Sequence, residues 1–206
     1  MARPREFDEK VVLEAAVQQF WRYGYEATSV RDLADRMGIT GASLYNAFGG
    51  KRSLYRLSLE HYLEQTFQER INRLETQYPP REALTAFFEE IIERSLSDRL
   101  RRGCMLVNSA LEIAPHDPEF QKVVARFLTQ VEAFFLRCVV AGQKDGAIAK
   151  SQSAQDMARL LLGVLLGIRV LARSKPDRKL LEGLARPAFA MLGNRKSIKR
   201  GVRANR

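Results

Sequence analysis

The sequence has few residues of the kinds that stabilise small folds covalently or through metals. It contains two cysteines, Cys104 and Cys138, and two histidines, His61 and His116. Two cysteines are too few for a disulfide framework, and we expect both to be buried thiols. Because the histidines are not spaced from the cysteines as zinc ligands are, no metal site is expected. The sequence also has no phosphate-binding loop and no nucleophile–base pattern of an enzyme, so neither catalysis nor a cofactor is expected.

Glycine and proline are sparse, with 13 and 7 residues among 206. No segment alternates between apolar and polar residues as a half-buried strand does. Helices should therefore dominate, and we predict an all-α fold. Apolar periodicity and capping residues place about nine helices along the chain. Their expected ranges are 8–23, 28–38, 40–48, 51–77, 82–97, 103–113, 117–145, 153–173 and 177–192.

The chain also lacks a hydrophobic run long enough to cross a membrane. Its longest apolar stretch, residues 160–171, is interrupted by Arg169. The first residues, Met1 to Arg5, lack the apolar region of a secretory signal. We therefore expect a cytoplasmic protein without a membrane partner.

Negative charge is scarce only towards the C-terminus. The formal net charge is +10, yet residues 1–52 carry eight Lys and Arg against seven Asp and Glu, and residues 53–172 carry fifteen of each. Most of the positive excess lies in residues 173–206, so net charge alone is weak support for nucleic-acid binding. Residues 194–206 have almost no apolar side chains and should form a disordered basic tail. Lipid binding through this tail is one alternative function.

Residues 28–48 carry the strongest local pattern. Ser29 and Asp32 have the spacing of a capping box at the start of one short helix. Gly38 can adopt the left-handed backbone conformation that ends this helix, and Thr40 can cap the next one. The pattern predicts two short helices joined by a tight glycine turn.

The second of these helices, residues 40–48, has two contrasting faces. At about 100° per residue, Leu44 and Phe48 lie on one side and should anchor the helix to its own domain. The other side has small or uncharged side chains with Tyr45 at its rim, as a helix that reads the DNA major groove requires. A helix-turn-helix used only for packing is the structural alternative, but a solvated face would more often carry Glu and Lys.

The segment TSVRDLADRMGITGASLYNAFGGKRSLY resembles the helix-turn-helix of the TetR family in residue types and spacing, and the resemblance covers about residues 8–55. It implies a DNA-binding domain at residues 1–52, followed by a helical effector-binding and dimerisation domain at residues 53–193 and the basic tail. It also implies a dimeric regulator that binds double-stranded operator DNA. Such a regulator is usually a repressor that a small-molecule effector releases.

The resemblance transfers the family's DNA contacts to matching positions of this chain. Phosphate contacts are implied at helix starts and beside the reading helix. The residues are Thr28, Thr40, Tyr45, which can also touch a thymine methyl group, and Lys51. Contacts with base edges are implied for Ala42, Ser43 and Asn46, of which Asn46 suits adenine.

Two positions depart from the family pattern. Gly41 stands where many relatives have Lys, and Ala47 stands where an aromatic residue or His commonly contacts the DNA backbone. Arg3 and Arg5 could compensate as an arm that enters the minor groove. A merely solvated basic terminus is the alternative.

An effector cavity in the C-terminal part should be largely apolar, with a few polar groups on its wall. Cys104, Asn108 and Glu112 recur every fourth residue and so would share a helix face, which makes them the candidate effector-binding residues. Alternatively, Asn108 and Glu112 cap neighbouring helices or face solvent.

Cys104 also follows a glycine at the start of a predicted helix, which resembles a feature of certain TetR-like regulators that sense oxidants or electrophiles. A helix N-terminus, with Arg101 and Arg102 nearby, lowers the pKa of a thiol. The alternative function is therefore a redox- or electrophile-responsive repressor that acts through Cys104. The simpler interpretation is a packed thiol.

Gly163 and Gly167 lie four residues apart in the penultimate helix and would let another helix approach closely. We expect this helix and the last one to form a homodimer. Two-fold symmetry then implies an approximately palindromic operator.

Overall fold

The computed structural model describes residues 8–193. Arg3, Arg5 and the basic tail therefore lie outside the described residues. Residues 8–193 form nine helical segments, of which the one over residues 51–77 consists of three consecutive elements, and these residues contain no strand, so the all-α fold class is confirmed. The elements are α1 Glu9–Tyr23, α2 Val30–Met37, α3 Gly41–Phe48, α4 Lys51–Leu63, the π-helix η1 Glu64–Gln68, α5 Glu69–Gln77, α6 Pro80–Ser97, α7 Met105–Glu112, α8 Pro118–Asp145, α9 Ala154–Ser174 and α10 Arg178–Met191.

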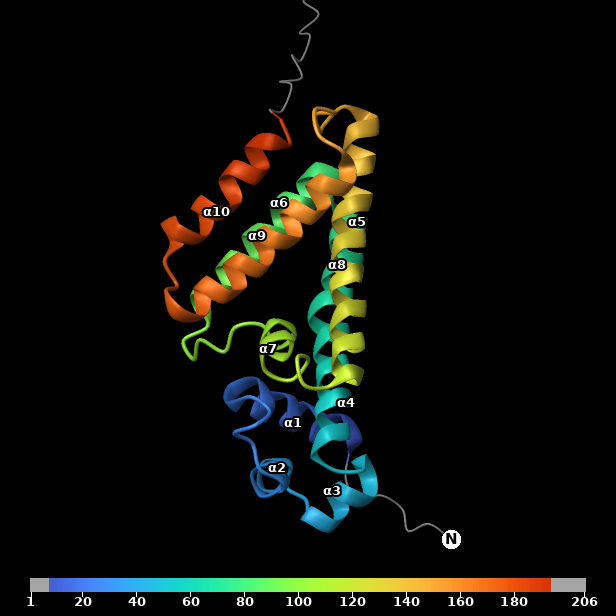
Figure 1. Cartoon of the computed structure of the whole chain (residues 1–206), viewed down its shortest axis with the longest axis vertical. Coiled ribbons are helices and arrows are strands. Elements are labelled where there is room, and N and C mark those ends of the chain that lie inside the picture. The colour runs from blue at the N-terminus through green and yellow to red at the C-terminus, as the bar shows by residue number, and fades with distance from the viewer. Residues whose placement is uncertain (1–7, 194–206) are drawn as a thin grey trace, which may run out of the picture.

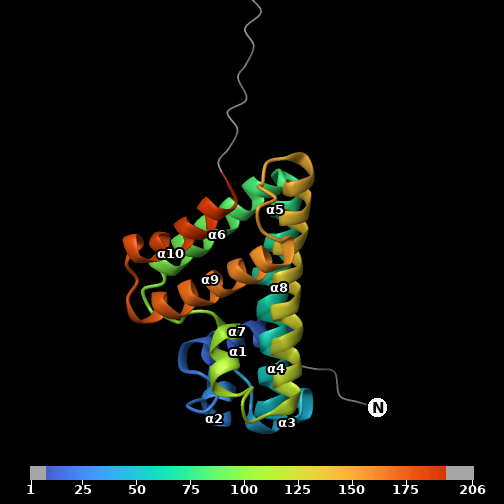
Figure 2. The same cartoon turned by 45° about the horizontal axis from the view of Figure 1, so that its top comes forward.

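The helices form an elongated molecule (Figure 1). Helices α1, α2 and α3 lie together at one end, and α10 and the end of α8 lie towards the other. The run from α4 through η1 to α5 follows the long axis beside α8, while α6, α9 and α10 extend to one side (Figures 1 and 2). None of the helices within residues 8–193 has both the length and the apolar character needed to span a bilayer.

Side-chain caps fix the starts of the short helices. The Ser29 backbone N–H donates to Asp32 Oδ2 at 2.8 Å, and the Asp32 N–H donates to Ser29 Oγ at 3.1 Å, so the predicted capping box at the start of α2 is confirmed. Gly38 ends α2 with φ of 67°, in the left-handed region that glycine adopts without strain. Aspartate or serine caps of the same kind start α1, α8, α9 and α10.

The sequence predicts one uninterrupted α-helix over residues 51–77, and the structure differs in its middle. The helical path is continuous, but Glu64–Gln68 adopt π-helical geometry between α4 and α5. A π-helical turn holds more residues than an α-helical turn. At this junction Leu63, Thr66 and Phe67, which have the spacing of an ordinary helix face, line one small cavity.

The buried apolar residues form two clusters along the molecule. One cluster joins η1, α5, α6, α9, α10 and the second half of α8, with Phe87 and Phe134 fully buried in it. The other joins α1 to α4, α7 and the first half of α8, so Leu44 of α3 and Phe120 of α8 belong to one core. The packing therefore does not divide at residue 52, and the expected domain boundary stays a prediction.

Candidate nucleic-acid interface

Helix α3 starts at a cap and is held by two buried side chains. Thr40 Oγ1 accepts a hydrogen bond from the Ser43 backbone N–H at 3.1 Å. Leu44 and Phe48 are 0% and 5% exposed and pack in the cluster shared with α1, α2 and α4. The inward face of α3 is therefore the face that the sequence predicts.

The opposite face of α3 is open. Ala42 and Asn46 are exposed, and Tyr45 is 57% exposed. Ser43 is half-buried, and its hydroxyl lies 2.9 Å from the Thr40 hydroxyl. The structure thus brings these five residues together at one end of the molecule, on a helix that has no charged side chain. We call this surface, residues 40, 42, 43, 45 and 46, the reading face.

Tyr45 lies against the turn that leads into α4. A Cβ atom on Gly50 would come within 3.0 Å of the Tyr45 ring, and Gly50 has φ of 110°, so both space and backbone geometry require glycine here. Gly50 also provides no side-chain cap for α4. The start of α4 therefore lies beside Tyr45 without a side-chain cap, and the first backbone N–H groups of such a helix are good donors to phosphate.

Lys51 is not free to reach outward in this conformation. Its Nζ lies 4.3 Å from the centre of the Tyr25 ring and donates to the Glu26 carbonyl oxygen at 3.5 Å. These contacts hold the ammonium group over the loop between α1 and α2. A phosphate contact by Lys51 stays a prediction, and it requires the side chain to leave Tyr25.

Thr28 lies below the surface. Its side chain is 1% exposed, and its hydroxyl donates to the Gly24 carbonyl oxygen at 2.7 Å. The hydroxyl is thus not available to a phosphate in this structure, contrary to what the resemblance implies. Spacing alone could not show this, because Thr28 precedes the capping residue Ser29 and its direction is set by the turn after α1.

The two departures from the family pattern have different surroundings. An added Cβ at Gly41 would meet no atom within 4 Å, so a longer side chain could extend from α3 without strain. Ala47 is half-buried against the cluster around Leu44. The absence of lysine at position 41 therefore removes a positive charge from the interface and leaves the packing unchanged.

An ion-pair group that the sequence did not suggest ties α4 to the start of α8. Arg52 Nε lies 2.8 Å from Asp117 Oδ2, and Arg52 Nη2 lies 2.7 Å from Glu119 Oε2. The hydrogen bond from Arg52 lowers the pKa of Asp117 below its usual range. Asp117 also caps α8, so one carboxylate fixes both a helix start and its position against α4.

The three candidate effector-binding residues do not line a common cavity. Cys104 lies on the wall of a largely apolar cavity of about 50 Å³, which residues of α4, η1, α5, α6, α7, α8 and α9 also line. Asn108 and Glu112 instead border an open hollow beside Tyr23 and Gly24. The reason is that Cys104 precedes α7 in an extended conformation, so the helical periodicity that links Asn108 to Glu112 does not reach it.

Asn108 and Glu112 make contacts between segments instead. Asn108 Nδ2 donates to the Arg102 carbonyl oxygen at 2.9 Å, and its Oδ1 accepts from Arg173 at 3.1 Å. Glu112 Oε1 accepts from the Glu26 backbone N–H at 2.9 Å and so fastens α7 to the loop before α2. These contacts favour the alternative in which both residues stabilise neighbouring segments.

Both cysteines are free. Cys138 is buried, as expected, and burial raises the pKa of its thiol to about 12. Cys104 is half-buried. The two thiols belong to different hydrophobic clusters, so neither has the other beside it as a disulfide partner.

Comparisons with known proteins agree with this geometry. Residues 12–57 match the family described as bacterial regulatory proteins, tetR family, and residues 80–187 match the tetracyclin repressor-like C-terminal domain. The uncharacterized HTH-type transcriptional regulator YezE of Bacillus subtilis is 32% identical over 183 residues, which cover 88% of this chain and 94% of YezE. The HTH-type transcriptional repressor ComR of Escherichia coli is 26% identical over 83% of this chain and 82% of ComR.

A solved structure extends the agreement to the whole fold. It is a cysteine mutant of the TetR family transcriptional regulator CifR complexed with 26-bp double-strand operator DNA. The two chains superpose with a TM-score of 0.81 and 30% identity, over 93% of this chain and 100% of the other. Because the family matches cover both the helix-turn-helix and most of α6 to α10, the chain belongs to the TetR family of bacterial regulatory proteins.

Proposed function

We propose that this chain is a transcriptional repressor that binds an approximately palindromic operator as a homodimer and that a small-molecule effector releases it. One observation carries the DNA-binding role: the uncharged reading face lies exposed beside the uncapped start of α4. ComR is named a repressor, and the CifR mutant was complexed with operator DNA, which supports the same role here. The role places the protein in the cytoplasm with the chromosome and requires no catalytic activity.

The residues around the reading face divide into two roles. Thr40, the Tyr45 hydroxyl and the first N–H groups of α4 can bind phosphates and thereby set the position of the domain on DNA. Ala42 and Asn46 project towards base edges, where the Asn46 amide can pair with N6 and N7 of adenine. Ser43 joins them when its hydroxyl turns away from Thr40.

These roles predict different effects for two neighbouring substitutions. Tyr45→Ala should weaken binding to every DNA sequence by a similar factor, about tenfold, because it removes a positioning contact from each half-site. Asn46→Ala should instead reduce discrimination at particular base pairs by about 1–3 kcal/mol. The measurement is titration of the protein with an operator selected from fragments of the source organism's DNA, followed by single base-pair variants.

Matched controls are available on α5 and at its end. Tyr78→Ala and Asn72→Ala remove the same side chains from exposed positions away from the reading face and should leave DNA affinity unchanged. Loss of affinity in these controls, or equal effects of Asn46→Ala on all base pairs, would contradict the assignment. So would an affinity that does not change with salt concentration.

The dimer surface that we propose lies on α9 and α10. Leu160, Gly163, Gly167 and Val170 follow helical spacing on one face of α9, and Leu160 and Val170 are 37% and 47% exposed. An added Cβ at either glycine would meet no atom within 4 Å. Gly183 of α10 is equally open. An apolar face with such glycines allows a second copy of the helix pair to approach closely.

Effector release requires that ligand and DNA favour different arrangements of the two reading faces. The first half of α8, α7 and the α1 to α4 region share a core, and Arg52 and Glu112 fasten the same segments. A ligand that shifts α7 or α8 would therefore move α4 and α3 with them. Ligand and DNA then oppose each other thermodynamically, and operator affinity falls as the effector saturates.

The alternative of a thiol sensor at Cys104 is not favoured. Its sulfur lies half-buried beside Tyr62 and Arg169, where it contributes to packing. Cys138, the other cysteine, lies in a separate cluster. Under the proposed function, Cys104→Ser should leave operator binding and effector release intact.

A further inference from the structure

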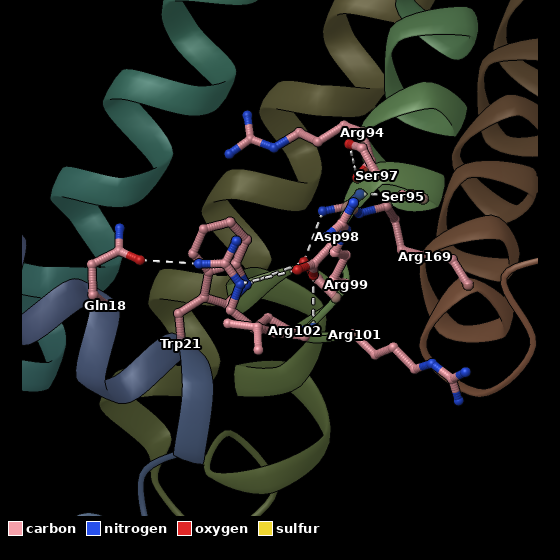
Figure 3. A pocket seen from close by; sticks show the side chains of 13 residues that line it. Gln18, Trp21, Arg94, Ser95, Ser97, Asp98, Arg99, Arg101, Arg102 and Arg169 are labelled. Carbon is pink, nitrogen blue, oxygen red and sulfur yellow. Dashed lines mark hydrogen bonds and ion pairs between the residues drawn. The ribbon is translucent and has the colours of Figure 1, made fainter.

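A cavity of about 490 Å³ lies where α1, the end of α6, the segment before α7 and α9 meet (Figure 3). Its size falls within the range of small-molecule sites, about 300–1,000 Å³. Its wall is strongly basic, with one carboxylate, Asp98, among several guanidinium groups. The arginines on the wall are Arg94, Arg99, Arg101, Arg102 and Arg169. We call this cavity the arginine pocket.

The carboxylate of Asp98 already has a cationic partner. Arg102 Nε lies 3.2 Å from Asp98 Oδ1, and the Arg102 backbone N–H donates to Asp98 Oδ2 at 2.7 Å. Figure 3 shows this pair beside Trp21, whose ring centre lies 3.8 Å from the Arg102 guanidinium carbon. In the described part of the chain, no carboxylate lies within ion-pair distance of Arg94, Arg99 or Arg101. The pocket wall therefore carries an excess of positive charge.

Arg169 makes this excess more significant because its side chain is 6% exposed. It donates to Ser95 Oγ at 2.9 Å and to the Gly103 carbonyl oxygen at 2.9 Å, and within residues 8–193 it has no carboxylate partner. A buried charge without a counter-charge is costly, so buried cations are normally paired. A bound anion in the pocket would supply the missing negative charge.

The backbone of the wall is also held in an uncommon conformation. Arg101 has φ of 51°, in the left-handed region that residues other than glycine rarely adopt. The bond from its N–H to the Asp98 carbonyl oxygen, at 2.9 Å, closes the turn that presents these arginines. Local strain of this kind is concentrated at functional sites.

We propose that the arginine pocket binds the effector and that the effector is a small organic molecule with a carboxylate group. Guanidinium groups bind carboxylates through paired, charge-assisted hydrogen bonds. Trp21, Leu100 and Ala172 offer apolar surface on the same wall for the carbon skeleton. This inference rests on the proposed function, because it names the class of ligand that releases the repressor.

The position of the pocket explains how binding of such a ligand would affect the DNA-binding end of the molecule. Gln18 and Trp21 on its wall belong to α1, which packs with α2 and α4. Arg102 donates to Gln18 Oε1 at 3.0 Å, and Trp21 Nε1 donates to the Gly103 carbonyl oxygen at 3.1 Å. A carboxylate that binds Arg102 competes with Gln18 and Asp98, and so loosens the connection between α1 and the segment before α7.

The test uses benzoate and citrate as probes, with benzamide as the uncharged counterpart of benzoate. Calorimetry on the full chain should detect benzoate or citrate at low millimolar concentration and should detect benzamide at least about tenfold more weakly. Arg99→Gln should lower the affinity for the anion by about tenfold or more, because it removes one guanidinium group from the pocket wall. Arg99 is exposed, so its replacement should not disturb the core. Lys122→Gln removes the same charge from an exposed site on α8 and should change nothing.

A second arm measures operator affinity at constant ionic strength, so that screening by the added anion is excluded. The probe that binds should lower operator affinity of the unmodified chain and have less effect on Arg99→Gln. If neither anion binds to protein that still binds its operator, or if Arg99→Gln and Lys122→Gln bind equally, the inference is wrong while the repressor function stands. If the protein binds no operator DNA, the proposed function fails, and calorimetry alone then tests whether the arginine pocket binds a carboxylate.

Discussion

The substitution Gly163→Arg is expected to dissociate the dimer and to lower operator affinity by about 10²–10⁴-fold. This factor is the usual gain in affinity from linking two binding units, which the monomer would lose. Gly163 lies in the open face of α9, where no atom of its own chain comes within 4 Å of an added Cβ. The monomer should therefore fold normally, and replacing a glycine within a helix should even favour α9 by about 1 kcal/mol. A partner helix at close range would instead meet a long charged side chain.

Sedimentation velocity and operator titration on the Gly163→Arg variant measure the two effects together. Ala125→Arg places the same side chain on an exposed position of α8, away from α9 and α10, and should leave both the dimer and its affinity unchanged. A Gly163→Arg protein that stays dimeric with full affinity would show that the dimer forms through another surface.

Phe87→Ala is expected to lower the free energy of unfolding by about 3–5 kcal/mol. Phe87 is 0% exposed and lies at the centre of an aromatic group in the cluster that joins η1, α5, α6, α9, α10 and the second half of α8. Its ring centre lies 5.3 Å from Phe135, 5.4 Å from Phe134 and 6.2 Å from Phe67. Removing it takes away the contact that joins η1, α6 and α8 and leaves a cavity that the helices can fill only partly.

Urea unfolding at a fixed protein concentration measures this loss, because the stability of a dimer depends on concentration. Leu111→Ala removes an apolar side chain that is 68% exposed and should change stability by no more than about 0.5 kcal/mol. Phe87→Leu keeps most of the apolar volume, so its loss of stability should lie between those of Phe87→Ala and Leu111→Ala. An effect of Phe87→Ala as small as that of Leu111→Ala would mean that the core reorganises around the gap.

The sequence predicts the helices well because their ends depend on residues close in the chain. Ser29 with Asp32, Gly38 and Thr40 are local signals, and each occupies the capping or turn position expected of it. The buried face of α3 was equally predictable, since Leu44 and Phe48 lie one helical turn apart. Local signals of this kind also sufficed for the family resemblance.

Features that depend on distant contacts were not predictable. Thr28 is buried because its turn folds back on Gly24, and Lys51 is held by Tyr25, a residue 26 positions earlier. Glu112 binds a backbone N–H 86 positions away, which a helical periodicity cannot reveal. The π-helical turn at Glu64–Gln68 also has no local signal in the sequence, since it contains neither glycine nor proline.

The arginine pocket shows the same limit. Its arginines come from α6, from the segment after it and from α9, so their charges are far apart in the sequence and appear together only in the fold. Within residues 53–172 basic and acidic residues balance in number. The total thus hides a local imbalance, and only the three-dimensional arrangement reveals it.

The core that runs from α1 to the first half of α8 means that the DNA-binding end is not a detachable unit. A fragment that stops at residue 52 would lose Tyr55, whose ring centre lies 4.8 Å from that of Phe20, and Phe120, whose ring centre lies 5.4 Å from that of Tyr55. Such a fragment would present the apolar undersides of α1 and α3 to water. Evolution of a new regulator by exchanging only these first helices would therefore require matching changes in α7 and α8, which begin only at Met105 and Pro118.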